Sequence, residues 1–173
     1  LLVEMRLGKT LVTIRGLRTK GCEKILIAAP ISAMVSWKEQ LREEGEEFVE
    51  AYGMSSEKRA KIVVDALDRS GRVWTLVNYE GFNFVPEIAE APWCAVSADE
   101  SVKLKNPKSK VSRAFVEGFR NVECRSILTG LVTPESDMDL FQQFCFLHGR
   151  FMNKKNFWNW RTEFFEPDAS GYG

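Results

Sequence analysis

Three consecutive residues near the start of the chain could bind a nucleotide phosphate. Gly8, Lys9 and Thr10 follow a short apolar run at residues 1–5 and open an amphipathic segment. Backbone N–H groups at a helix N-terminus attract phosphate oxygens, so Lys9 would reach the β- and γ-phosphates of ATP and the Thr10 hydroxyl would bind Mg²⁺. Val3 stands where the full phosphate-loop pattern has its first glycine. An ordinary helix start therefore remains open as the alternative.

A pair of carboxylates forms the second candidate site. Asp99 and Glu100 end an apolar run at residues 93–98. At the carboxyl end of a strand, Asp99 would hold Mg²⁺ through water, and Glu100 would orient and deprotonate the attacking water. Helix capping by the pair is the alternative, and the polar Ser97 within the run slightly favours it. About 90 residues separate the pair from Lys9, which suits a RecA-like core, so both motifs together favour a Mg·ATP site.

The elements that must position these groups are apolar runs that alternate with amphipathic segments. The candidate strands are residues 1–5, 25–29, 47–52, 73–78, 93–98 and 125–128. The candidate helices are residues 9–18, 33–44, 56–69, 109–119, 137–147 and 154–164. Several runs lack polar alternation, which is typical of strands covered on both faces. The order predicts an α/β fold with a mostly parallel central sheet and helices on both faces, whose ligands bind beyond the carboxyl ends of the strands.

Single residues predict where some elements begin and what they pack against. Ser32 is expected to cap the second helix, and Ser55 or Ser56 the third. Gly81 is one of several glycines expected in loops. Trp37 lies at helical spacing from apolar neighbours, so we expect it to pack in the core.

The composition is that of one globular domain, with 173 residues, of which 45% are hydrophobic and 28% charged. Lys plus Arg equals Asp plus Glu at 24 each, so any nucleic-acid binding requires a local basic patch. No apolar stretch approaches the roughly 18 residues that span a bilayer, and we expect no membrane partner.

The four cysteines, Cys22, Cys94, Cys124 and Cys145, are far apart in the sequence, and His148 is the single histidine. No CxxC pair is present, so a zinc site is not expected. Cys94 and Cys124 lie in apolar runs and are expected to be buried free thiols, which favours a reducing compartment.

The order of the motifs resembles the N-terminal motor domain of SWI/SNF-type helicase-like ATPases in helicase superfamily two, with phage and bacterial versions as the nearest type. The segments that show this are residues 4–10, 25–30, 77–80, 99–107, 128–130, 139–141 and 165–173. The resemblance implies a RecA-like P-loop domain. It also implies that residues 1–173 are its first RecA-like domain, truncated at both ends and lacking the second, which supplies an arginine finger in cis. We therefore expect weak nucleotide binding and slow hydrolysis by this chain alone.

Roles are implied residue by residue. Nucleotide binding is implied for Leu7, Gly8, Lys9, Thr10 and Asp99. Mg²⁺ binding is implied for Thr10 and, through water, for Asp99, and catalysis for Lys9 and Glu100. Contact with a nucleic-acid backbone, double-stranded DNA by preference, is implied for Pro30, Lys105 and Asn106. Coupling of hydrolysis to movement is implied for Thr129 and Gly130.

Further basic residues surround Lys105, namely Lys103, Lys108, Lys110 and Arg113. They could neutralise phosphates, but charge runs are usually solvated faces, and the family motif favours a nucleic-acid role only for Lys105 and Asn106.

The leading functional hypothesis is a DNA-dependent helicase-like ATPase that couples ATP hydrolysis to movement on DNA, in the cytoplasm of a bacterial or phage-infected cell. Leu131 and Val132 stand where the family has Thr-Pro, and Thr133-Pro134 follow them. That departure favours the alternative, a nucleotide-gated or degenerate adaptor without turnover. A small-molecule phosphotransferase is the third hypothesis, although no acceptor motif is visible.

Overall fold

A parallel β-sheet forms the centre of the computed structural model, which describes residues 8–82, 86–131, 133 and 135–165. The strands are β1 (Lys24–Ala28), β2 (Phe48–Glu50), β3 (Val73–Val77), β4 (Ala95–Asp99) and β5 (Cys124–Leu128). Their order is β2-β3-β1-β4-β5, and every neighbouring pair is parallel. The α/β fold is therefore confirmed, with the predicted strand at residues 1–5 lying outside the described residues.

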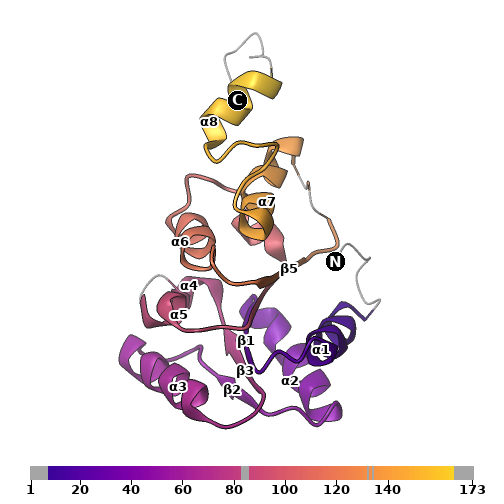
Figure 1. Cartoon of the computed structure of the whole chain (residues 1–173), viewed down its shortest axis with the longest axis vertical. Helices are drawn as coiled ribbons and strands as arrows, with labels where there is room; N and C mark the ends of the chain where they lie inside the picture. Colours follow the sequence, from indigo (N-terminus) through magenta and orange to yellow (C-terminus); the bar gives the residue numbers. More distant parts are fainter. Residues whose placement is uncertain (1–7, 83–85, 132, 134, 166–173) are drawn as a thin grey trace.

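Helices cover both faces of the sheet (Figure 1). They are α1 (Lys9–Thr19), α2 (Met34–Glu43), α3 (Ser56–Asp68), α4 (Tyr79–Phe82), α5 (Pro86–Glu90), α6 (Lys110–Gly118), α7 (Leu140–His148) and α8 (Phe157–Phe164). Three 3₁₀ turns join them, η1 (Ile31–Ala33), η2 (Ser101–Leu104) and η3 (Asp137–Asp139). Within the described residues, no helix is both long and apolar enough to cross a bilayer.

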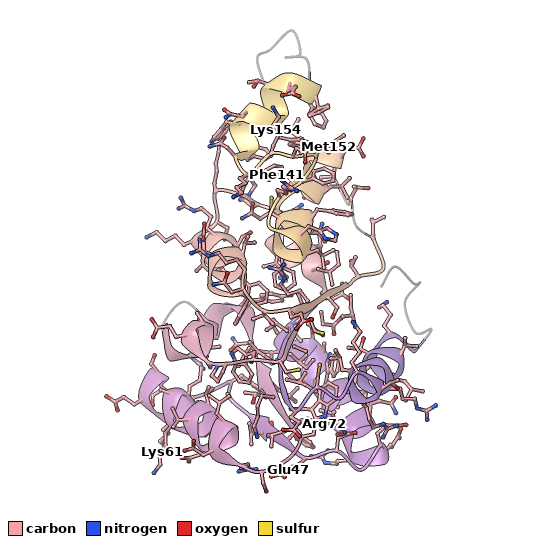
Figure 2. The ribbon with its side chains drawn as sticks, in the orientation of Figure 1. Glu47, Lys61, Arg72, Phe141, Met152 and Lys154 are labelled. Atoms are coloured by element: carbon pink, nitrogen blue, oxygen red, sulfur yellow. The ribbon has the colours of Figure 1, made fainter. Side chains whose placement is uncertain are left out.

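Two hydrophobic cores lie on the two faces of the sheet, because successive strand residues point to opposite sides. Ile25 and Ile27 of β1 pack in the core that contains α1 and α2, whereas Leu26 and Ala28 pack in the core that contains α3, α6 and α7. A smaller cluster around Phe141 joins α7 to α8. Figure 2 shows Phe141 far from Glu47 and Arg72, which lie at the opposite end of the molecule.

Some predicted boundaries were wrong. Ser32 does not cap the second helix: it lies inside η1, and α2 begins after Ala33. Ser55 does cap α3, since its side chain accepts a hydrogen bond from the backbone N–H of Lys58. Gly81 lies in the short helix α4 and not in a loop.

Three of the four cysteines meet in space, which their sequence separation did not predict. Cys94, directly before β4, and Cys124, the first residue of β5, both lie close to Cys22, because Ala95 pairs with Cys124 in the parallel register. Cys94 and Cys124 are free thiols, as predicted, but they are half-buried and not buried, whereas Cys22 and Cys145 are buried. Burial and the neighbouring thiol of Cys94 raise the pKa of Cys22 to about 12.

Candidate nucleotide site

The first part of the site is the N-terminus of α1. Gly8 caps this helix in the left-handed conformation, with φ of 75°. Among the described residues, no side chain caps the helix, and its first turn holds no acidic residue, so this end of the helix attracts anions. Lys9 and Thr10, the first two helical residues, are half-buried, and Leu7 lies outside the described residues.

Ion pairs hold α1 in place from its far end. Arg15 and Arg18 each contact the Glu44 carboxylate at the end of α2, at 2.8 and 2.7 Å. Hydrogen bonding from Arg15 holds the pKa of Glu44 below its usual range. Glu44, directly after α2, therefore helps to fix the position of α1, the helix that begins with Lys9 and Thr10.

Asp99 forms the second part of the site, at the carboxyl end of β4. Its side chain is 8% exposed, and Oδ2 accepts a hydrogen bond of 2.8 Å from the indole Nε1 of Trp37. Oδ1 accepts a bond of 3.0 Å from the backbone N–H of Glu100. Burial raises the pKa of Asp99 above its usual range, while these two bonds and the charge of Lys9 act in the opposite direction. The structure therefore brings Lys9 and Asp99 close enough to interact electrostatically.

The charge state of Asp99 yields a testable prediction. A carboxyl group whose pKa is raised on folding stabilises the protein below its unfolded pKa of about 3.9, and that contribution is lost as pH rises through the folded pKa. Without Mg²⁺, the Tm of Asp99→Asn relative to that of wild type is therefore expected to rise between about pH 4 and neutral pH. A pH-independent loss is also expected, because the amide has one oxygen for the two N–H donors of Trp37 and Glu100. Exposed Asp65→Asn on α3 should show no such trend. A difference that is constant with pH would contradict this assignment.

Glu100 adopts a backbone conformation that costs energy. Its φ and ψ are 49° and 53°, in the left-handed region that non-glycine residues rarely occupy. Such a residue costs on the order of 1–3 kcal/mol and is typical of functional sites. The conformation places the Glu100 side chain directly after the buried Asp99, at the start of η2.

Neighbouring side chains hold this strand end in place. The Tyr79 hydroxyl donates a 2.8 Å hydrogen bond to the backbone carbonyl of Asp99. The Ser101 hydroxyl after the acidic pair donates to Gln143 of α7 at 2.6 Å. Ser97, whose polarity argued against a strand, is satisfied by a 2.6 Å bond to the Ser126 hydroxyl of β5.

These supporting residues were not identified from the sequence. Spacing placed Trp37 in the core, where it is indeed fully buried, but its partner Asp99 lies 62 residues away. Tyr79 lies in the family-like segment 77–80, and that signal could have found it.

The other predicted site residues also lie at the carboxyl edge of the sheet. Pro30 follows β1, and Thr129 and Gly130 follow β5, the strand that pairs with β4 up to Asp99 and Leu128. The Thr129 hydroxyl is buried and donates to the Leu131 carbonyl at 2.8 Å, which closes the turn.

Lys105 and Asn106 make contacts within the chain. Lys105 forms an ion pair with Glu135. The Asn106 side chain is exposed and accepts a hydrogen bond of 2.8 Å from the backbone N–H of Lys108. A phosphate contact at Lys105 would therefore compete with Glu135.

Mg²⁺ usually keeps several waters and takes one or two protein ligands beside substrate phosphates. Thr10 and Asp99 fit that requirement, since each offers oxygen at the same edge of the sheet. Among the described residues, no group of three or more His, Cys, Asp or Glu side chains could hold a metal ion. The residues present therefore suit a metal that arrives with a nucleotide and not a cage built by the protein.

Comparison with known proteins identifies the family and the fold of the chain. A family model described as SNF2-related domain matches residues 1–170. Chromodomain-helicase-DNA-binding protein 7 from Gallus gallus and the same protein from Homo sapiens are each 30% identical to this chain. Each alignment covers 89% of this chain and 6% of the relative. The Sulfolobus solfataricus SWI2/SNF2 ATPase core, solved in complex with dsDNA, has a TM-score of 0.74 at 23% identity, with coverage of 99% of this chain and 35% of that chain. That structure shows the shared fold, and this chain spans about a third of it.

Proposed function

This chain belongs to the SNF2-related domain family, and on that basis we propose that it is the first RecA-like, Mg·ATP-binding domain of a DNA-dependent motor ATPase. The observation that supports the proposal is that Lys9, at the start of α1, lies near enough for its charge to act on Asp99, at the end of β4, which Glu100 follows. Two motifs about 90 residues apart in sequence thus face one edge of the sheet. Either motif alone would suit a helix start or a cap.

The proposed roles follow from charge and position. Lys9 and the N–H groups at the N-terminus of α1 bind the β- and γ-phosphates, and Leu7 and Gly8 form the loop before them. Thr10 binds Mg²⁺ directly and Asp99 through water, and the metal neutralises charge that develops on the phosphates. Glu100 accepts a proton from the attacking water.

The rest of the motor is also a proposal. An arginine finger from a second RecA-like domain in cis would complete the site, because such a residue contributes several orders of magnitude in rate. Pro30, Lys105 and Asn106 would contact the backbone of double-stranded DNA, and Thr129 and Gly130 would couple hydrolysis to movement. The phage or bacterial subtype, and the cytoplasmic location in a bacterial or phage-infected cell, stay predictions.

A nucleotide-gated adaptor without turnover is the second candidate. The feature that favours it is Leu131, which is 58% exposed and stands where the family has threonine. The half-buried Lys9 and Thr10 beside Asp99 and Glu100 favour the motor. Stimulation of hydrolysis by DNA would distinguish a motor from an adaptor and from a phosphotransferase.

The test of nucleotide binding is a titration of the chain with a fluorescent ATP analogue and Mg²⁺. Lys9→Ala is expected to weaken binding by roughly 10- to 100-fold, because a hydrogen bond to a charged group is worth about 1.5–3 kcal/mol. Exposed Lys61→Ala on α3 should bind like wild type. If both variants keep the wild-type affinity, the site is not at Lys9.

A further inference from the structure

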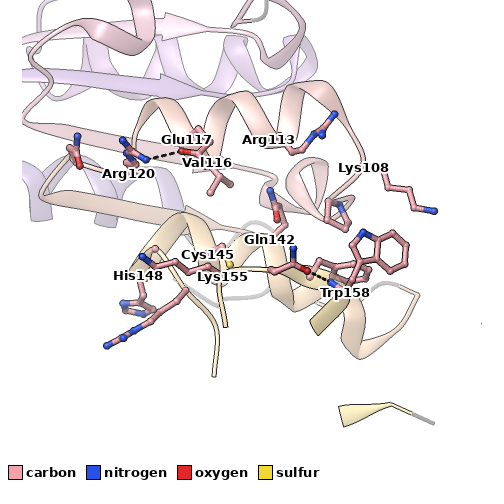
Figure 3. A pocket seen from close by; sticks show the side chains of 16 residues that line it. Lys108, Arg113, Val116, Glu117, Arg120, Gln142, Cys145, His148, Lys155 and Trp158 are labelled. Carbon is pink, nitrogen blue, oxygen red and sulfur yellow. Dashed lines mark hydrogen bonds and ion pairs between the residues drawn. The ribbon is translucent and has the colours of Figure 1, made fainter. Parts of the chain in front are cut away.

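A groove of about 700 Å³ runs between α6 and α7 and past the start of α8 (Figure 3). Five Lys or Arg residues and the histidine line it, namely Lys108, Arg113, Arg120, His148, Arg150 and Lys155. Glu117 is the one acidic residue among its lining residues. The whole chain has equal numbers of basic and acidic residues, so this groove is a local concentration of positive charge.

Most of this charge is not neutralised by other described residues. Arg120 forms an ion pair with Glu117 at 3.2 Å, and both side chains are more than 60% exposed. Arg113, Arg150 and Lys155 are exposed, and none of them forms an ion pair with another described residue. Exposed cations that face one groove repel one another unless an anion lies between them.

The cations lie on both walls and along the length of the groove. Arg113 and Arg120 are seven residues apart on and just after α6, about 10 Å along a helix axis. Figure 3 shows Arg120 and His148 at one end and Lys108 and Trp158 at the other. The Trp158 side chain is 47% exposed, and Lys108 Nζ lies 5.0 Å from its ring centroid.

The groove is separate from the candidate nucleotide site. α6 and α7 pack in the core on one face of the sheet, and α1, which presents Lys9, packs on the other. The proposed DNA contacts Pro30, Lys105 and Asn106 are absent from its lining. Lys108 and Arg113, which the sequence favoured as a solvated face, are exposed, and both line this groove.

We propose that the groove binds the phosphate backbone of a nucleic acid, as a contact additional to the carboxyl edge of the sheet. A phosphodiester chain is a row of negative charges, which matches cations spaced along two walls, and an exposed indole suits a sugar or a base. The walls are helices and a short loop, which offer no strand edge to an extended peptide. Those features favour a phosphate backbone over an acidic peptide.

The test is a titration with a fluorescein-labelled, mixed-sequence DNA duplex in the absence of nucleotide, followed by anisotropy between about 50 and 200 mM salt. The double variant Arg113→Gln, Lys155→Gln is expected to bind roughly tenfold more weakly at low salt and to lower the slope of log K against log salt by about 2. The matched control is Lys58→Gln, Lys61→Gln, which removes the same charge from exposed positions of α3, at the opposite end of the molecule from α8 (Figure 1). The control should keep the wild-type slope.

Equal losses in both double variants would overturn the proposal, since binding would then follow net charge alone. So would a wild type that does not bind the duplex, or a groove variant that loses affinity only for a labelled poly-glutamate peptide. The groove variant should keep its affinity for the fluorescent ATP analogue. The outcome is thus independent of the Lys9→Ala titration, and either proposal can fail while the other stands.

Discussion

Replacement of Glu100 by Gln is expected to slow ATP hydrolysis by about 10²- to 10⁴-fold while Mg·ATP affinity stays within a few-fold of wild type. The amide keeps the size of the side chain but cannot accept a proton from water. The backbone N–H of Glu100 still donates to Asp99, so the Asp99 carboxylate should keep its position. Only the chemical step should change.

The measurement is single-turnover hydrolysis of radiolabelled ATP with protein in excess and duplex DNA present, which resolves the slow rates expected of one RecA-like domain. Exposed Glu57→Gln at the start of α3 is the matched control and should hydrolyse at the wild-type rate. Unchanged hydrolysis in Glu100→Gln would assign the acidic pair a capping role. A wild type that binds Mg·ATP but never hydrolyses it, even with a second RecA-like domain supplied, would favour the adaptor.

The sheet and its covering helices could be predicted because strands that are buried on both faces consist of uninterrupted apolar residues. Residues 25–29 are apolar throughout, since alternate side chains enter two different cores. An apolar run of the same kind predicted that Asp99 lies at the end of a strand, where ligands bind in parallel sheets. Ser97 weakened that prediction, because its hydroxyl partner Ser126 lies on β5 and has no local signal.

Features that depend on distant partners were missed. The Trp37 indole reaches Asp99 through the packing of α2 on the sheet, and spacing alone showed only that Trp37 is buried. Ser32 looked like a helix cap, but Pro30 starts a 3₁₀ turn that delays the helix to Met34. The basic groove combines residues 108–120 with residues 148–155, and only the packing of α7 against α6 brings them together.

The burial of Arg59 could also not be predicted from the sequence. Arg59 is 6% exposed, and its guanidinium donates to the carbonyls of Ala51 and Gly81 at 2.9 and 3.0 Å and of Met54 at 3.2 Å. A Cβ on Gly81 would lie 2.7 Å from Arg59 Cζ, so a glycine is needed where α4 passes the guanidinium. Arg59 thereby ties α3 and the end of β2 to the helix that begins at Tyr79.

Arg59→Met is expected to lower the free energy of unfolding by about 3–5 kcal/mol, because two buried carbonyls and one partly buried carbonyl lose a charged donor at once. Exposed Lys61→Met on the same helix should change it by less than about 0.5 kcal/mol, as measured by urea denaturation. The effect should extend to the nucleotide site, because Tyr79 of α4 donates to the Asp99 carbonyl. We therefore expect the folded Arg59→Met variant to bind Mg·ATP more weakly than the Lys61→Met variant. Equal affinity would mean that Asp99 is held by Trp37 and the sheet alone, and that Arg59 acts on stability without acting on the site.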